Sequence, residues 1–140
     1  MKTAGASILD ACQSTKLFSC WFKDAQTWRA WFAFLAAMFG LPMDAEAREI
    51  FKACTSRSQS RSNGHAEAWL ICGRRSGKSF ILALIAVFLA CFRDWSPYLA
   101  PGERGTVFVV ATDRRQARVI YRYVRALLLN VPAIASLMVG

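Results

Sequence analysis

The sequence predicts an α/β fold in which helices cover both faces of a parallel sheet, preceded by a helical N-terminal segment. The first observation is a pair of short apolar runs, 68–72 and 106–111, which are typical of buried parallel strands. The second is a helical pattern after each run, at 80–92 and 113–129. This order is the opening of a doubly wound, three-layer sandwich. Because two strands make a poor parallel sheet, the predicted sandwich is incomplete.

Size and composition indicate one packed domain. The chain has 140 residues, near the common size of a domain, and 55% of them are apolar, above the usual 45–50% or so. Its net charge of +9 indicates a polyanionic partner: a nucleotide, a nucleic acid or an anionic membrane surface. Charge alone does not choose among these partners.

Cysteine usage and hydropathy argue against a zinc-binding, secreted or membrane-spanning protein. The five cysteines form no C-x-x-C pair and His65 is the one histidine, which argues against a zinc site and favours reduced thiols in a cytosolic protein. The N-terminal ten residues contain no long apolar stretch, so no secretory signal is expected. The apolar run 80–92 is shorter than the roughly 20 residues that span a bilayer, and 30–43 is interrupted by Gly40 and Pro42. No membrane role is therefore expected.

Residues 1–54 are predicted to form a helical lead-in. A helix is expected from a capping residue, Asp24, to a stop signal at Gly40. Its apolar side chains recur at helical spacing: Trp28, Trp31, Phe32, Leu35 and Phe39. Asp44 opens a second helix that runs to about Phe51. Residues 55–65, rich in Ser and Arg, are predicted to be a flexible linker, and 66–140 the start of the second domain.

A glycine-rich loop between the first predicted strand and its helix matches a phosphate loop. Backbone N–H groups at the start of a helix favour phosphate oxygens. Lys78 is expected to neutralise the β- and γ-phosphates, and the Ser79 hydroxyl to hold Mg²⁺. The sequence therefore predicts ATP and Mg²⁺ as ligands. The residues expected to bind them are Gly73, Arg74, Arg75, Ser76, Gly77, Lys78 and Ser79.

This loop departs from the usual pattern G-x-x-x-x-G-K-[ST], which would place glycine at 72. Here position 72 is Cys72, and the first glycine follows one step later. The alternative interpretation is a glycine turn that bears a surface lysine. Arg74 and Arg75 could both be solvated charges that attract phosphate generally. Alternatively, Arg74 reaches the γ-phosphate as an arginine finger, which makes it a candidate catalytic residue together with Lys78.

The run 69–79 resembles the deviant Walker A loop of phage terminase large subunits, the motors that package DNA into capsids. Runs 98–105 and 111–117 resemble the second-strand region of that family, and the aromatic segment 18–32 is similar to its helical lead-in. The resemblance implies a P-loop NTPase domain of RecA-like type that hydrolyses ATP with Mg²⁺. It also implies double-stranded DNA, a small terminase subunit and a portal protein as partners of a ring of full-length subunits in the host bacterial cytoplasm.

The resemblance also marks what the chain lacks. It places the acidic pair of the Walker B strand and the nuclease domain beyond Gly140, so an N-terminal fragment that hydrolyses ATP poorly by itself is expected. Asp113, which closes the second predicted strand, is the alternative magnesium ligand within the chain. Gln26 would contact adenine, or lie exposed in the first turn of a helix.

The last predicted helix has an arginine row along one side. Its members recur at i, i+4, i+8 and i+11: Arg114, Arg118, Arg122 and Arg125. Apolar residues form the opposite, core-facing stripe: Ala117, Ile120, Val124 and Leu127. The row is predicted either to follow a DNA phosphate backbone or to be a solvated face.

The sequence leaves three other classes of function to consider. A helicase-like ATPase or a small-molecule kinase has the same loop, although no acidic or histidine cluster suggests a kinase acceptor site. A non-catalytic DNA- or capsid-binding fragment would have a vestigial loop. A membrane-associated peptide is disfavoured by the length of the apolar runs.

Overall fold

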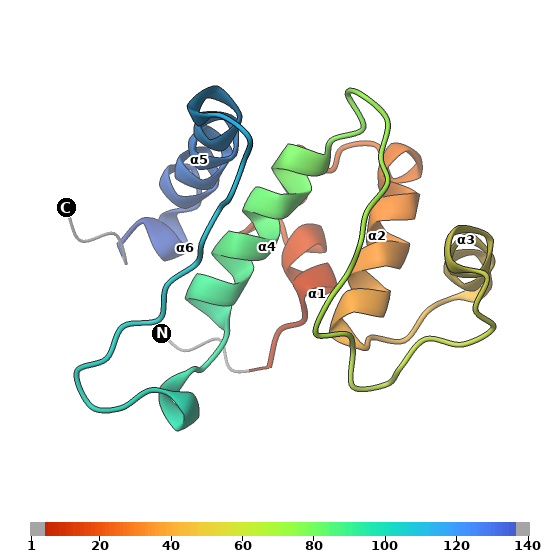
Figure 1. Cartoon of the computed structure of the whole chain (residues 1–140), viewed down its shortest axis with the longest axis horizontal. Coiled ribbons are helices and arrows are strands. Elements are labelled where there is room, and N and C mark those ends of the chain that lie inside the picture. The colour runs from red at the N-terminus through yellow and green to blue at the C-terminus, as the bar shows by residue number, and fades with distance from the viewer. Residues whose placement is uncertain (1–4, 137–140) are drawn as a thin grey trace. The chain divides into compact units, whose positions relative to one another are not determined.

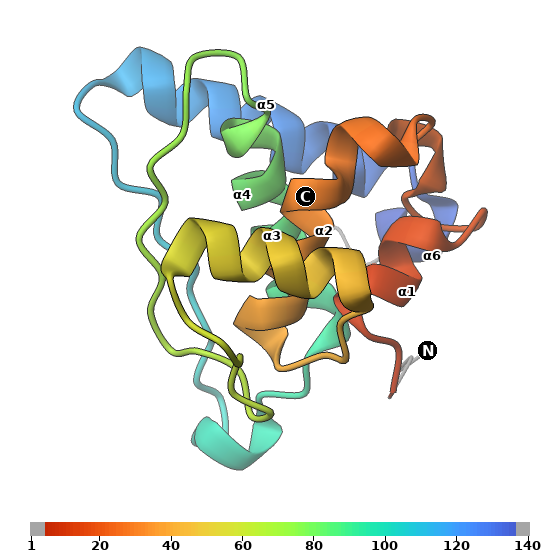
Figure 2. The same ribbon diagram turned by 90° about the vertical axis from the view of Figure 1, so that its right-hand side faces the viewer.

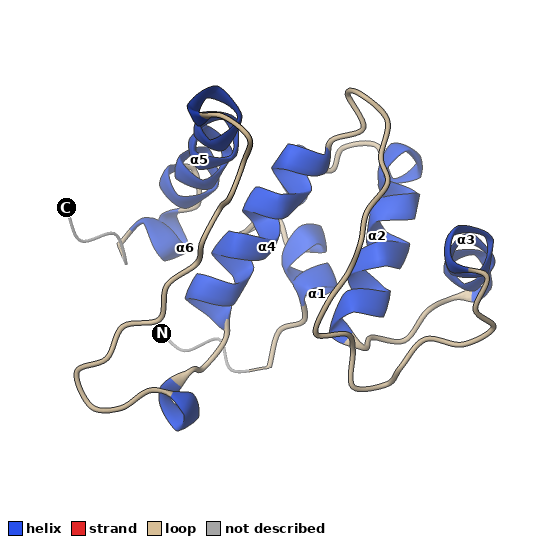
Figure 3. Ribbon diagram, viewed as in Figure 1, coloured by secondary structure: helices blue, strands red, loops and turns tan. Residues whose placement is uncertain are grey.

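The computed structural model describes residues 5–136 and shows helices joined by loops (Figures 1 and 3). No β-strand occurs among these residues. The α/β sandwich with a parallel sheet that the sequence predicts is therefore wrong for this chain.

The two predicted strands are extended coil instead. Their side chains are largely in solvent: Trp69 and Ile71 are 88% and 104% exposed, and Phe108 and Val110 are 83% and 91% exposed. No backbone hydrogen bond joins either segment to another part of residues 5–136. A strand requires a neighbour for its N–H and C=O groups, and neither apolar run has one.

The chain folds as two compact units. The N-terminal unit is Ser7–Cys72, and the C-terminal unit runs from Gly73 onward together with Gly5 and Ala6. No helix in the described part of the chain is long and apolar enough to cross a membrane.

The N-terminal unit is a small cluster of helices around an apolar core. Helix α2 packs against both α1 and α3, and Figures 1 and 2 show α3 beside α2. Aromatic residues of this unit contact one another, with ring centroids 5.1 Å apart for Phe22 and Trp28 and 5.3 Å apart for Phe22 and Phe32. The elements are α1 (Ile8–Gln13), η1 (Ser19–Trp21), α2 (Ala25–Phe39) and α3 (Ala45–Thr55).

The predicted ends of α2 are confirmed. Asp24 caps the helix by accepting a hydrogen bond from the backbone N–H of Gln26, at 3.1 Å. Gly40 ends it in the left-handed conformation, with φ at +66°. Asp44 caps α3 as expected, but α3 continues to Thr55, one turn beyond the predicted end at Phe51.

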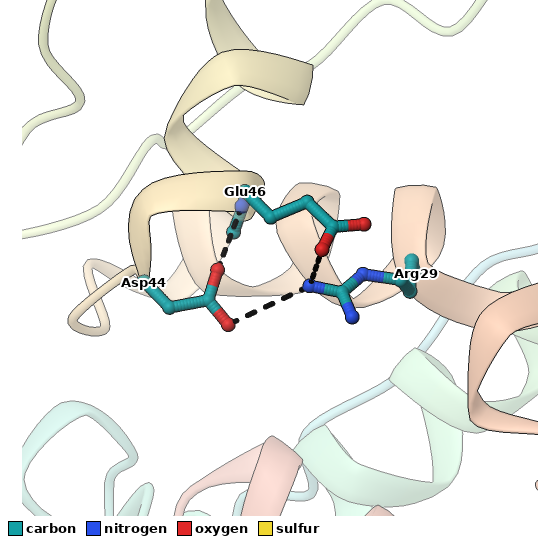
Figure 4. Close-up of polar contacts among 4 residues, drawn as sticks. Arg29, Asp44 and Glu46 are labelled. Atoms are coloured by element: carbon teal, nitrogen blue, oxygen red, sulfur yellow. Dashed lines mark hydrogen bonds and ion pairs between the residues drawn. The ribbon is translucent and has the colours of Figure 1, made fainter.

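A short polar network joins the start of α3 to α2 (Figure 4). Arg29 forms an ion pair with Glu46 and lies 3.8 Å from an oxygen of Asp44. The other oxygen of Asp44 accepts a hydrogen bond from the N–H of Ala47 at 2.7 Å. The Asp44 carboxylate therefore caps its own helix and also faces the arginine of the neighbouring helix.

The first residue of the Ser/Arg-rich segment 55–65 is the last residue of α3, and residues 56–65 form no helix. The end of this segment is held against α2. The N–H of His65 donates to the carbonyl of Met38 at 3.0 Å. Gly64 is buried, and a Cβ atom there would lie 2.5 Å from the same carbonyl oxygen. Backbone contact with the end of α2 thus orders the linker where it approaches the apolar run 68–72.

The C-terminal unit consists of a buried apolar helix packed against an amphipathic one. Residues of α4 with full or nearly full burial include Ile81, Ala83, Leu84 and Val87. Helix α5 packs against α4 and α6, and Phe80 meets Tyr123 edge to face at 5.7 Å. The elements are α4 (Lys78–Phe92), η2 (Ser96–Tyr98), α5 (Arg114–Leu129) and α6 (Pro132–Ala135).

Candidate functional site

The predicted phosphate loop is a turn that leads directly into α4. Gly77 is the N-cap of the helix, in the left-handed conformation with φ at +85°, and Arg75 is left-handed as well, with φ at +60°. A left-handed conformation is rare for a residue with a Cβ atom. No side chain caps the first turn of α4. The positive end of the helix dipole therefore faces the loop.

Three cations line one open pocket above this turn. The pocket has a volume of about 510 Å³, and its lining residues are Arg74, Arg75 and Lys78. All three side chains are exposed. The Lys78 ammonium donates to the carbonyl oxygen of Gly73 at 3.3 Å, so it folds back over the loop. The structure thus brings together the three charged members of the predicted site.

The remaining loop residues contribute backbone and hydroxyl groups. Ser76, Gly77 and Ser79 are partly buried, while Gly73 is exposed. A Cβ atom added at Gly73 would meet nothing within 4 Å, so this position has open space around it. Such an arrangement leaves the backbone accessible to a bulky anion.

The part of the sequence that contains the pocket is strongly cationic. Residues 73–140 contain ten Arg and Lys residues and three acidic ones, so most of the net charge of +9 belongs to this part of the sequence. The three carboxylates make local hydrogen bonds. Asp94 accepts from Ser96, Glu103 from the N–H of Ala100, and Asp113 from the first turn of α5. The field at the pocket therefore favours an anion with several charges.

The chemistry of the donor groups fits a polyphosphate better than it fits a bare metal ion. No group of His, Cys, Asp or Glu residues in the described part of the chain is able to hold a metal ion. Ser79 remains the predicted Mg²⁺ ligand, and its single hydroxyl would require phosphate oxygens to complete the coordination. Asp113, the alternative magnesium ligand, is the N-cap of α5 and follows no strand.

Two predicted residues lie on other elements. Gln26 is exposed in the first turn of α2, in the N-terminal unit, and its N–H is bonded to Asp24. The arginine row lies along α5, where all four members are exposed. On the opposite side of α5, Leu127 is fully buried, and three residues are partly buried: Ala117, Ile120 and Val124. The two predicted stripes of α5 are confirmed.

Sequence reasoning missed helix α1. Its Ser7 side chain accepts from the N–H of Asp10 at 3.1 Å, and the Asp10 carboxylate accepts from the N–H of Ser7 at 2.8 Å. This reciprocal capping box was visible in the sequence as a serine followed three residues later by an acid. The left-handed turn at Arg75 carried no such signal.

No protein-family model matches the chain, and comparison with curated proteins and with solved structures gives no significant match. The interpretation of the site therefore depends on its own residues and geometry.

Proposed function

We propose that the loop 73–79 binds the phosphates of ATP together with Mg²⁺, and that it serves a DNA-packaging motor of the terminase type. The single observation that supports binding most directly is the pocket of Arg74, Arg75 and Lys78 at the uncapped start of α4. The proposed role in a DNA-packaging motor is supported by the resemblance of run 69–79 to the terminase loop. Because no sheet is present among residues 5–136, the proposal concerns the loop and not a complete ATPase domain.

Each pocket residue has a role in this proposal. Lys78 moves from the carbonyl of Gly73 to the β- and γ-phosphate oxygens, where a charged donor forms stronger hydrogen bonds than with a neutral carbonyl. Arg74 and Arg75 neutralise the outer phosphates, and Arg74 is the candidate arginine finger. The N–H groups of the first turn of α4 point toward the anion.

The chain is expected to bind ATP but not to hydrolyse it at an appreciable rate. Ser79 would supply one hydroxyl ligand to Mg²⁺, and the ion would help to neutralise the charge of the phosphates. Positioning the attacking water usually requires a carboxylate or an amide side chain. All three carboxylates of residues 73–136 make local hydrogen bonds away from the loop. The chain by itself is therefore expected to release phosphate no faster than the background rate.

The test is calorimetric titration of ATP with Mg²⁺ into the wild type, Lys78→Ala and Arg104→Ala. Arg104 is an exposed cation of the same unit outside the pocket, so its variant has the same change of net charge. Loss of a charged hydrogen bond costs about 1.5–3 kcal/mol, so Lys78→Ala should weaken binding at least about tenfold. Arg104→Ala should bind as the wild type does.

Two outcomes would contradict the proposal. Absence of binding by a folded wild type would make the loop vestigial. Equal weakening in both variants would show that ATP responds to overall charge and not to the pocket. Sustained phosphate release by the wild type would leave binding in place but overturn the expectation that the chain is inactive by itself.

A further inference from the structure

Helix α5 has an unusually one-sided charge. Residues 114–129 include five arginines and no acidic residue. Four of the arginines form the α5 arginine row, which we define as Arg114, Arg118, Arg122 and Arg125. All four are exposed. The row therefore presents positive charge to solvent along three turns of a helix.

Within the described part of the C-terminal unit, no carboxylate forms an ion pair with an arginine of the row. The printed sequence places only three acidic residues after Gly73. The acidic residue nearest in sequence to the row is Asp113, and its carboxylate caps the helix through the N–H groups of Arg115 and Gln116. Four like charges without carboxylate partners repel one another, and a polyanion would relieve that repulsion.

Two kinds of polyanion fit a basic amphipathic helix, and α5 favours one of them. A helix that lies on a membrane buries its apolar face in the lipid. The apolar face of α5 is already in use, because the helix packs against α4 and α6 and Leu127 has no exposed surface. Tyr121, Tyr123 and Leu129 are also exposed on α5, but the charge of its exposed surface comes from arginines alone. Such a face binds a phosphate backbone without inserting into a bilayer.

We propose that the α5 arginine row binds the phosphate backbone of a duplex nucleic acid, independently of the nucleotide pocket. The row extends over twelve residues, 114–125, so its first and last members are about 16 Å apart at the usual helical rise. One strand of a duplex presents about five phosphates over that length. Four arginines therefore match one stretch of a single strand.

This mode of binding should not depend on the base sequence of the nucleic acid. The row itself contains arginines alone, and phosphate contacts position a protein without reading the sequence. Duplexes of different sequence but equal length should bind with equal affinity. Four phosphate contacts also predict a loss of affinity of about a hundredfold between 50 and 200 mM salt.

The experiment measures fluorescence anisotropy of a labelled duplex of about 20 base pairs across a salt series. The test variant is Arg118→Gln/Arg122→Gln, and the matched control is Arg57→Gln/Arg61→Gln. Both double variants lower the net charge by two, and the control arginines are exposed in the linker of the other unit. Glutamine is about as good a helix former as arginine, so α5 should remain folded, which circular dichroism checks.

The test variant should lose affinity only about tenfold between 50 and 200 mM salt, because half of the row remains. The control variant and Lys78→Ala should keep the salt dependence of the wild type. The result with Lys78→Ala separates duplex binding from nucleotide binding.

Several results would overturn the proposal. One is a test variant, folded by circular dichroism, that keeps the wild-type salt dependence. Another is an equal reduction in the control variant, which would assign binding to overall charge. A third is an equal reduction in Lys78→Ala, which would assign duplex binding to the pocket. The last is row-dependent binding of the wild type to vesicles of anionic phospholipid without binding to the duplex.

Discussion

Gly40 and Gly64 lie against each other through their backbones, and neither position has room for a side chain. A Cβ atom at Gly64 would approach the carbonyl oxygen of Met38 to 2.5 Å, and one at Gly40 would approach the nitrogen of Gly64 to 2.4 Å. Both residues are also left-handed, with φ at +66° and +75°. Their spacing of 24 residues in the sequence offers no local signal for this contact.

Gly64→Ala should therefore destabilise the N-terminal unit by about 2 kcal/mol or more, from the left-handed conformation and the displaced backbone together. Gly105→Ala is the control, because its added Cβ would meet one carbon at an ordinary 3.8 Å. Urea unfolding of both variants gives the free energies. A change below about 0.5 kcal/mol at Gly64 would mean that the linker does not rest on α2 in solution.

The helices α2, α3, α4 and α5 follow local rules, which is why they were predictable. Asp24, Asp44 and Asp113 each cap the helix that follows them, as their positions before apolar-periodic segments indicate. Propensity and capping depend on neighbours within four residues. The exact end of α3 and the presence of α1 were missed, although α1 also has a local signal in its capping box.

Capping by Asp24 predicts a dependence of α2 on pH. The hydrogen bonds from the Thr27 hydroxyl and the Gln26 N–H lower the pKa of the Asp24 carboxyl below its ordinary 3.8. A lowered pKa stabilises the folded state above 3.8, and this contribution is lost as the pH falls through the lower folded-state value. Asp24→Asn keeps a cap but does not titrate.

Thermal unfolding of the wild type and Asp24→Asn between about pH 5 and pH 2.5 measures this contribution. The midpoint of the wild type should fall further than that of the variant across the range. Asp10, whose pKa is lowered by its bonds to Ser7, contributes in the same direction and should remain in both proteins. Parallel curves for the two proteins would refute a role for Asp24 ionisation.

The molecule as a whole divides its large apolar residues between a buried set and an exposed set. Phe88 is 3% exposed in α4, whereas Phe108 is 83% exposed in the extended segment that was predicted to be a strand. The same residue type thus has opposite environments in one unit. Burial decides its contribution to stability.

Phe88→Ala should cost about 3–5 kcal/mol of unfolding free energy, since it leaves a cavity in a packed helix. Phe108→Ala should change it by less than about 0.5 kcal/mol. Denaturant unfolding of the matched pair makes the comparison. A cost at Phe108 as large as that at Phe88 would mean that the segment 106–111 is packed in solution.

The sequence by itself determined the positions of four helices, the polar linker, the cationic loop before α4 and the two stripes of α5. Each of these depends on residues close together in the chain. The tertiary structure alone decided that the runs 68–72 and 106–111 form no sheet, because pairing requires a neighbouring strand that apolar composition does not supply. It also decided that Arg74, Arg75 and Lys78 line one pocket, since this depends on the left-handed turns at Arg75 and Gly77.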